Sequence, residues 1–181
     1  MGTPKLLLGL AGQSLLGRVV ASARASRCAE IVVVLGAEAE NIRPEMEGAR
    51  VRLVTNARYR EGMGTSLAAG IAALPPECEA AVVLLGDQPF VDAGSIDALI
   101  DAYRRTGKPI VVSRYGDVTG APTLFARALF PEAARLRGDA GGRPLVQRHP
   151  ELVEEVALPA AAGRDVDTPE DLARLAQLME D

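Results

Sequence analysis

Short apolar runs alternate with longer amphipathic segments along most of the chain. The apolar runs have the length of β-strands, and the segments between them repeat their apolar residues at helical spacing. This alternation is typical of right-handed βαβ units and predicts a mostly parallel sheet with helices on both faces. The predicted strands are 31–35, 51–54, 82–85, 110–112, 120–125 and 153–158, and the predicted helices are 14–25, 37–46, 67–74 and 92–105, with a short helix before His149.

Two predicted helices begin with clear capping chemistry. Ser14 is placed to cap the helix that ends near Ala25, whose buried side is predicted to consist of Leu15, Leu16, Val19, Val20 and Ala23. Near the end of the chain Thr168 occupies a cap position, with Pro169 following and Asp171 three residues after the cap. The closing helix predicted there has an apolar stripe of Leu172, Leu175, Ala176 and Met179.

Composition limits the class of protein. A length of 181 residues with 48% hydrophobic residues suits one domain, 1–181, with a sizeable core. A net charge of -4 without a run of like charges argues against a nucleic-acid partner. No run approaches the roughly 20 apolar residues of a membrane span, so we expect a soluble, cytoplasmic protein without a membrane partner. Cys28 and Cys78 lack metal-ligand spacing and are expected to be reduced thiols.

The stretch 82–89 is the strongest candidate for a functional strand end. Its apolar half, 82–85, carries no polar residue, which suits a parallel strand covered on both faces. Gly86 and Pro89 then turn the chain and leave Asp87 at the carboxyl end of the strand, where open α/β sheets bind their ligands. A carboxylate there suits magnesium, while the simpler alternative is that Asp87 only caps the following turn.

Two further stretches offer candidate ligand contacts. In the polar loop 55–67, Gly62 and Gly64 permit close backbone approach, and Thr65 or Ser66 is predicted to cap the next helix; the alternative is an ordinary capped connection. Asp165 and Asp167 precede the closing helix on a segment that could lie beside the Asp87 strand. Two carboxylates from separate loops can hold one cation, whereas the alternative is a pair of solvated turn residues. His149 has no neighbouring nucleophile or ligand pair and is interpreted as a surface residue.

Taken together these stretches resemble the molybdenum cofactor cytidylyltransferase group within the MobA-like nucleotidyltransferases. The family fold is a three-layer α/β/α sandwich with a mostly parallel sheet, of the nucleotide-diphospho-sugar transferase type. The matching residues occur in the family's order over the whole chain. They are 1–8, Asn56 with 61–63 and 66–67, 86–89, Pro122 with 124–125, 138–139 with Gly141 and Arg143, and 165–171.

The resemblance implies a reaction and roles for individual residues. The phosphate of molybdenum-molybdopterin would attack the α-phosphorus of CTP and release pyrophosphate, a reaction that depends on positioning and charge neutralisation. Asp87 and Asp167 would hold Mg²⁺, and Lys5 would neutralise phosphate charge. Gln88 would help to bind the nucleotide, and the loop that contains Asn56, Gly62, Met63 and Ser66 would face the pterin. A recipient molybdoenzyme is a possible protein partner.

The chain also departs from the family pattern. Relatives begin with a strand and a glycine-rich loop, and this sequence starts at what resembles the end of that loop. The strand would be central in the sheet, so the hypothesis is that the natural start lies upstream or that the chain is truncated. Ala121 stands where relatives often have a polar residue, and 142–144 differs slightly from the family's usual pattern.

Four alternatives to the cytidylyltransferase interpretation are open. GTP could replace CTP, because the residues that best contact the base would lie in the absent segment. Another small phosphorylated acceptor could replace molybdopterin. A noncatalytic protein that binds or carries the cofactor is an alternative of a different class, and an unstable fragment is the fourth.

Overall fold

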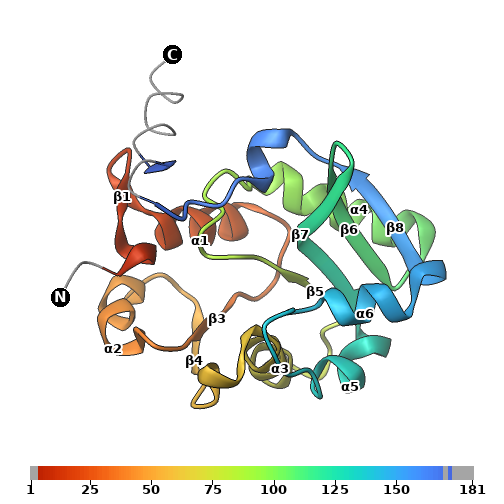
Figure 1. The fold of residues 1–181 in the computed structure, drawn as a ribbon, viewed down its shortest axis with the longest axis horizontal. Helices are drawn as coiled ribbons and strands as arrows, with labels where there is room; N and C mark the ends of the chain where they lie inside the picture. The colour runs from red at the N-terminus through yellow and green to blue at the C-terminus, as the bar shows by residue number, and fades with distance from the viewer. Residues whose placement is uncertain (1–3, 169–170, 173–181) are drawn as a thin grey trace.

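The structure is a computed structural model that describes residues 4–168 and 171–172. Its strands form three separate sheets, and 3-10 turns occupy several connections (Figure 1). The strands are β1 Gly9–Leu10, β2 Gln13–Ser14, β3 Val32–Leu35, β4 Arg52–Thr55, β5 Ala80–Val83, β6 Ile110–Tyr115, β7 Val118–Ala126 and β8 Val153–Ala157. The helices are α1 Leu15–Ala25, α2 Ala39–Ile42, α3 Met63–Ala72, α4 Ala93–Thr106, α5 Phe130–Ala133 and α6 Arg143–Arg148. The 3-10 turns are Lys5–Leu7, Arg43–Met46, Tyr59–Glu61, Arg127–Leu129, Pro150–Leu152 and Ala160–Gly163.

The β3–β4 sheet is parallel, whereas the four-stranded sheet contains both parallel and antiparallel pairs. β3 and β4 pair in parallel, with Val32 opposite Arg52 and Leu35 opposite Thr55. The four-stranded sheet has the order β5-β7-β6-β8, in which β6 and β8 are parallel. β7 runs antiparallel to both of its neighbours. The tight turn after β6 reverses the chain, so β7 pairs directly with β6. The sequence-based expectation that 120–125 crosses the sheet as an extended segment is therefore confirmed.

The sheets lie between two layers of helices. On one side, α4 buries Leu99 and Ala102 against Val111 and Leu124. On the other side, α3, α5 and α6 cover the neighbouring positions of the same strands, including Ile110, Val112 and Phe125. Figure 1 shows α4 behind the four-stranded sheet and α5 and α6 in front of it. Alternate residues along each strand face opposite sides of the sheet, so helices pack on both faces. The result is the three-layer α/β/α sandwich that the sequence predicted.

Local capping signals define the ends of two helices. Ser14 accepts a hydrogen bond from the backbone nitrogen of Gly17 at 2.9 Å and caps α1. All five α1 residues predicted to face the core are buried. Asp92 caps α4 by accepting from the backbone nitrogen of Ser95 at 2.7 Å. The start at Ser14 was predicted from its capping residue, whereas the helix over 92–105 was predicted from its amphipathic pattern.

The strand that leads to the candidate site is less covered than its sequence predicted. The expectation of an apolar, parallel strand buried on both faces over 82–85 is wrong in three respects. The strand β5 ends two residues earlier, its four residues are all half-buried, and it pairs antiparallel with β7. Within the described part of the chain β5 pairs only with β7, and β3 pairs only with β4, so each strand has one edge without a partner strand. Helix α1 contacts both, packing Leu16 against Val33 and Ala23 near Val82.

Three further expectations concern the closing helix, membrane spans and the two cysteines. The capping chemistry at Thr168 is present, but most of the closing helix, with Leu175, Ala176 and Met179, lies outside the described residues. Among the helices that the structure describes, none combines the length and the apolarity needed to cross a bilayer. Both cysteines, Cys28 and Cys78, are free thiols.

The Asp92 cap makes the stability of α4 dependent on acid. The side-chain and backbone hydrogen bonds from Ser95 hold the pKa of Asp92 below its ordinary value of 3.8. The ionised cap therefore contributes fully above that value, and its contribution is lost as the pH falls through the lower folded-state pKa. Asp92→Ala should reduce the free energy of unfolding by about 1 kcal/mol at pH 7, whereas Asp92→Asn should cost only a few tenths.

Urea unfolding of the three proteins at pH 7 and pH 3 measures both effects. The gap between wild type and Asp92→Asn should move in favour of the variant at pH 3, because the amide keeps its acceptor oxygen when the carboxylate becomes protonated. An equal gap at the two pH values would contradict the assigned role of the cap.

Candidate functional site

A hydrogen bond joins the end of β5 to a segment close to the carboxyl end of the described chain. The backbone nitrogen of Val166 donates to the carbonyl oxygen of Asp87 at 3.0 Å. The side chain of Val166 is fully buried in a cluster with Leu10 and Leu15. This bond and this anchor place the residues on either side of Val166 against the loop that follows β5. The two acidic stretches predicted to meet are therefore neighbours in the structure.

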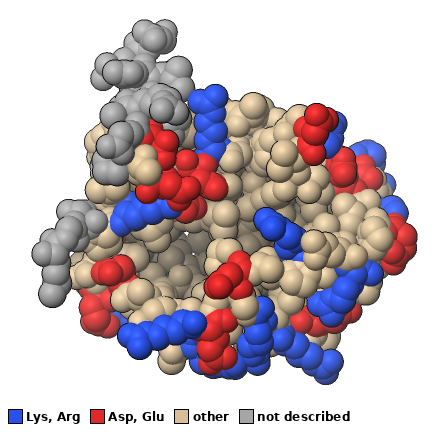
Figure 2. Space-filling model, viewed as in Figure 1, with Lys and Arg blue, Asp and Glu red and all other residues tan. Residues whose placement is uncertain are grey.

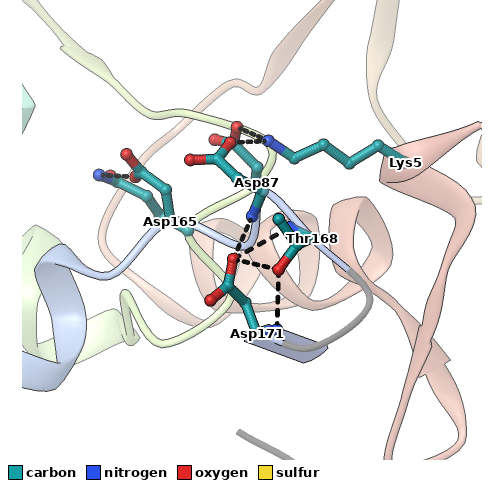
Figure 3. Close-up of polar contacts among 7 residues, drawn as sticks. Lys5, Asp87, Asp165, Thr168 and Asp171 are labelled. Atoms are coloured by element: carbon teal, nitrogen blue, oxygen red, sulfur yellow. Dashed lines mark hydrogen bonds and ion pairs between the residues drawn. The ribbon is translucent and has the colours of Figure 1, made fainter. Parts of the chain in front are cut away.

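Lys5 bridges two carboxylates at this junction. Its ammonium nitrogen lies 2.7 Å from Asp87 Oδ2 and 2.7 Å from Asp167 Oδ1 (Figure 3). The Lys5 and Asp87 side chains are 34% and 26% exposed, whereas that of Asp167 is 70% exposed. The contact is therefore partly shielded on the Asp87 side and open to solvent on the Asp167 side. Lys5, Asp87 and Asp167, which the sequence analysis placed in one site, are brought together.

The acidic neighbours change the titration of Lys5. Desolvation is the largest single influence and lowers its pKa, but it is outweighed by hydrogen bonds to Asp167 and Asp87 and by their charges. The net effect is a pKa above the ordinary value of 10.5, so the ammonium is the stable form at neutral pH. The site therefore carries one fixed positive charge beside two acidic groups.

A capping box fixes the backbone next to Asp167. The Asp171 carboxylate accepts hydrogen bonds from the Thr168 backbone nitrogen at 3.0 Å and from its hydroxyl at 2.8 Å. The Thr168 hydroxyl in turn accepts from the backbone nitrogen of Asp171 at 3.1 Å. The Asp171 carboxylate also accepts from the backbone nitrogen of Asp167, at 3.3 Å. The reciprocal bonds satisfy donors at the helix start and orient Asp167 on its exposed segment.

Gln88 binds the acidic segment through a side-chain hydrogen bond. Its amide nitrogen donates to Asp165 Oδ1 at 2.8 Å, and the residue is only 5% exposed. The amide oxygen of Gln88 is buried and has no hydrogen-bond partner among the residues that the structure describes. The sequence analysis did not predict the bond to Asp165, because nothing in the local pattern relates the two residues. Binding of a nucleotide by Gln88 stays a prediction, with its nitrogen already occupied.

The loop before α3 forms a second group of candidate residues. Asn56 is buried, and its amide nitrogen donates to the hydroxyl oxygens of Thr65 at 2.9 Å and Ser66 at 3.1 Å. The prediction that Thr65 or Ser66 caps a helix from residue 67 is wrong, because α3 starts at Met63 with Gly62 at its cap. Thr65 lies inside the first turn and donates to backbone oxygens of the preceding loop.

Gly62 and Gly64 let this loop approach the backbone of another loop. A Cβ atom added to Gly62, whose φ is +100°, would lie 2.3 Å from the carbonyl carbon of Gly138. One added to Gly64 would lie 2.7 Å from the backbone nitrogen of Arg137. The backbone nitrogen of Gly64 donates to the oxygen of Gly138 at 2.8 Å. The glycines were predicted to permit close approach, and the observed partner is the chain itself.

The two groups differ in what they offer a ligand. Met63 is 51% exposed and is one of the large apolar side chains on the surface, so it is available for contact. Asn56 and Gly62 are buried in contacts within the protein, and their binding roles stay predictions. His149 lies 3.0 Å from Glu132 and has no place in either group. Figure 2 shows acidic side chains gathered beside a hollow in this face of the molecule.

The donor set at the Lys5 junction suits a hard cation. Carboxylate oxygens are the ligands that magnesium and manganese prefer. Across residues 4–168 and 171–172, no cluster of three or more His, Cys, Asp or Glu side chains is arranged to hold a metal. A cation at Asp87 and Asp167 would therefore need further ligands from water or from the phosphates of a substrate.

Comparison with known proteins identifies the class to which this architecture belongs. The α/β/α sandwich with an acidic loop after β5 is the fold of nucleotide-diphospho-sugar transferases. The chain superposes with a TM-score of 0.81 on a manganese complex of Rv0371c from Mycobacterium tuberculosis H37Rv. The two are 34% identical, and the match covers 97% of this chain and 92% of that structure.

Within this class the family is defined by sequence. Residues 1–153 match the MobA-like NTP transferase domain, and the chain belongs to this family of nucleotidyltransferases. Nicotine blue oxidoreductase from Paenarthrobacter nicotinovorans is 31% identical over 95% of this chain and 87% of its own length. Phosphoenolpyruvate guanylyltransferase from Mycolicibacterium gilvum is 35% identical over 72% of this chain and 59% of its own length. Relatives in this family thus carry names of different reactions.

The close approach at Gly64 generates a testable prediction. Gly64→Ala should reduce the free energy of unfolding by about 1–3 kcal/mol, because the new methyl group would meet the backbone of Arg137. Gly94→Ala is a matched control, since Gly94 is also the second residue of a helix and its nearest neighbour to a Cβ would be Asp92 Oδ1 at 3.6 Å.

The control should be neutral or slightly stabilising because alanine favours the helix. Urea denaturation of both variants gives the comparison. Equal stability of the two would show that the loops do not constrain one another.

Proposed function

We propose that the protein transfers CMP from CTP to the phosphate of molybdenum-molybdopterin and releases pyrophosphate. The observation that carries this proposal is the meeting of Lys5, Asp87 and Asp167 at the end of β5. In the reaction a phosphate oxygen of the acceptor bonds to the α-phosphorus of CTP. The bond from that phosphorus to its bridging oxygen breaks, and the electron pair leaves with pyrophosphate. The reaction needs no covalent enzyme intermediate, only positioned charge.

Asp87 and Asp167 are the residues proposed to hold Mg²⁺. Their oxygens already share one cation, the Lys5 ammonium, which supports their ability to converge on another. When bound, the metal would supply charge neutralisation to the triphosphate. Asp87 is fixed by the backbone bond to Val166, whereas Asp167 is mostly exposed and can adjust to the ligand.

The remaining residues are assigned to orientation and binding. Lys5 would neutralise phosphate charge, because a lysine ammonium is a movable point charge on a flexible stem. Gln88 would contribute to the nucleotide site through the segment that it supports. The surface around Met63 and Ser66, held by Asn56 and Gly62, would face the pterin. Met63 supports this assignment best, because its exposed side chain suits a flat apolar ring.

The base and the acceptor are the less constrained parts of the proposal. The name of the mycobacterial guanylyltransferase relative supports GTP with another phosphorylated acceptor as a second candidate. A cofactor carrier is a third, and the name of the oxidoreductase relative points to a different reaction class. Neither a carrier nor an oxidoreductase would release pyrophosphate from a nucleotide. A molybdoenzyme that receives the product, and action in the cytoplasm, complete the proposal.

We also propose that this single domain is completed by one further strand between β3 and β5, followed by a glycine-rich loop. The support is the edge that each strand leaves without a partner strand in the described residues. Helix α1 packs against both strands. Backbone amides of such a loop would cradle phosphate, a contribution that Lys5 alone does not supply.

Replacing Asp87 by Asn tests the role of the acidic pair. The substitution keeps the shape of the side chain and removes its charge, so pyrophosphate release from CTP should fall at least about 100-fold at ordinary magnesium. Asp117→Asn is the matched control, because Asp117 is an exposed carboxylate in the turn between β6 and β7. Full activity of Asp87→Asn would refute the metal role.

Nucleotide choice and the role of the further strand can be measured in one experiment. Pyrophosphate release is followed with magnesium, molybdenum-loaded molybdopterin and either CTP or GTP. The chain of 181 residues is compared with a version that carries an upstream strand and glycine-rich loop. We expect release with CTP from the longer version and a weaker rate from the shorter. Equal rates would refute the strand proposal, and preference for GTP would refute the cytidylyl assignment.

A further inference from the structure

The acidic pair, Asp87 and Asp167, holds the Lys5 ammonium as a cation between its two carboxylates. The two carboxylates that share the Lys5 ammonium come from segments far apart in the sequence, and each lies at hydrogen-bond distance from the same nitrogen. Without a cation between them, Asp87 and Asp167 would repel one another. Lys5 offsets one of their two negative charges and holds the segments together.

The oxygens that hold Lys5 are also proposed metal donors. Asp87 Oδ2 and Asp167 Oδ1 point to one place, which the ammonium occupies. A divalent cation bonds carboxylate oxygens at about 2.0–2.1 Å when it is magnesium, closer than the ammonium lies. Metal and ammonium would repel each other there, so the two cations are alternatives for the same oxygens.

The position of Lys5 allows its ammonium to move away from the two carboxylates. It begins the short 3-10 turn Lys5–Leu7, which has no buried residue, and its side chain is one-third exposed. A flexible stem of four methylene groups connects the ammonium to the backbone, so the ammonium can move away without a change in the fold. Among the described residues, the ammonium bonds to the two carboxylates alone.

We propose that Lys5 occupies the acidic pair until a divalent metal displaces it, and that this displacement releases the ammonium for the phosphate charge of the substrate. This inference rests on the metal site of the proposed function and adds an order of events to it. Metal entry precedes the phosphate contact of Lys5. The lysine thus acts as a positioning residue for Asp87 and Asp167 before it contacts substrate.

A titration of the protein with Mn²⁺ alone tests the exchange. The concentration of free Mn²⁺ is measured by electron paramagnetic resonance. Lys5→Met should bind Mn²⁺ about fivefold or more tightly than wild type, because two partly exposed ion pairs no longer have to be broken. Lys108→Met is the control, since Lys108 is the only other lysine in the sequence and it contacts the backbone oxygen of Glu151. Its affinity should stay within about twofold of wild type.

A second measurement uses the unmodified protein and does not depend on a variant that folds. The rates at which an amine-acylating reagent modifies Lys5 and Lys108 are measured by peptide mass spectrometry, with and without saturating Mn²⁺. Displacement should raise the rate at Lys5 severalfold and leave Lys108 unchanged. A matched titration with Ca²⁺ distinguishes binding of a cation from redox effects of manganese.

The outcomes separate this inference from the proposed function. Unchanged or weaker Mn²⁺ binding by Lys5→Met, or an unchanged acylation rate, overturns the exchange while the metal site stands. Loss of Mn²⁺ binding in Asp87→Asn shows that the metal site itself is present. Failure of both wild type and Lys5→Met to bind Mn²⁺ overturns the metal site and the exchange together.

Discussion

The candidate site depends on one backbone hydrogen bond, from Val166 to the carbonyl oxygen of Asp87. It fastens the acidic segment to the loop after β5, and the buried side chain of Val166 prevents that segment from sliding. Gln88 and the capping box of Thr168 and Asp171 then set the direction of the carboxylates on either side. Asp87 and Asp167 are therefore held in place by contacts other than their own ion pairs with Lys5.

Features that act over a few residues could be predicted from the sequence. The caps at Ser14 and Thr168 were each placed correctly, because a cap and its partner lie within one helical turn. The three-layer arrangement also followed from the alternation of strands and helices. Lys5, Asp87 and Asp167 were grouped by resemblance to a family, since their positions span the chain and no local pattern relates them.

Features that depend on distant partners could not be predicted in the same way. Helix α3 starts at Met63, and Asn56 donates to the two hydroxyl groups that were expected to cap the helix. Gly62 and Gly64 face the 137–139 loop, which their own sequence does not identify. The half-buried state of β5 reflects the absence, in the described residues, of a strand along one edge, whereas its apolar sequence indicates only that covering would be favourable.

The edges of β3 and β5 have a consequence for how the protein behaves with other chains. An uncovered strand edge presents backbone donors and acceptors that can pair with any extended peptide, including another copy of the same protein. The half-buried apolar residues of β5 would make such pairing favourable and poorly selective. A segment that covered these edges would therefore also protect the protein from self-association.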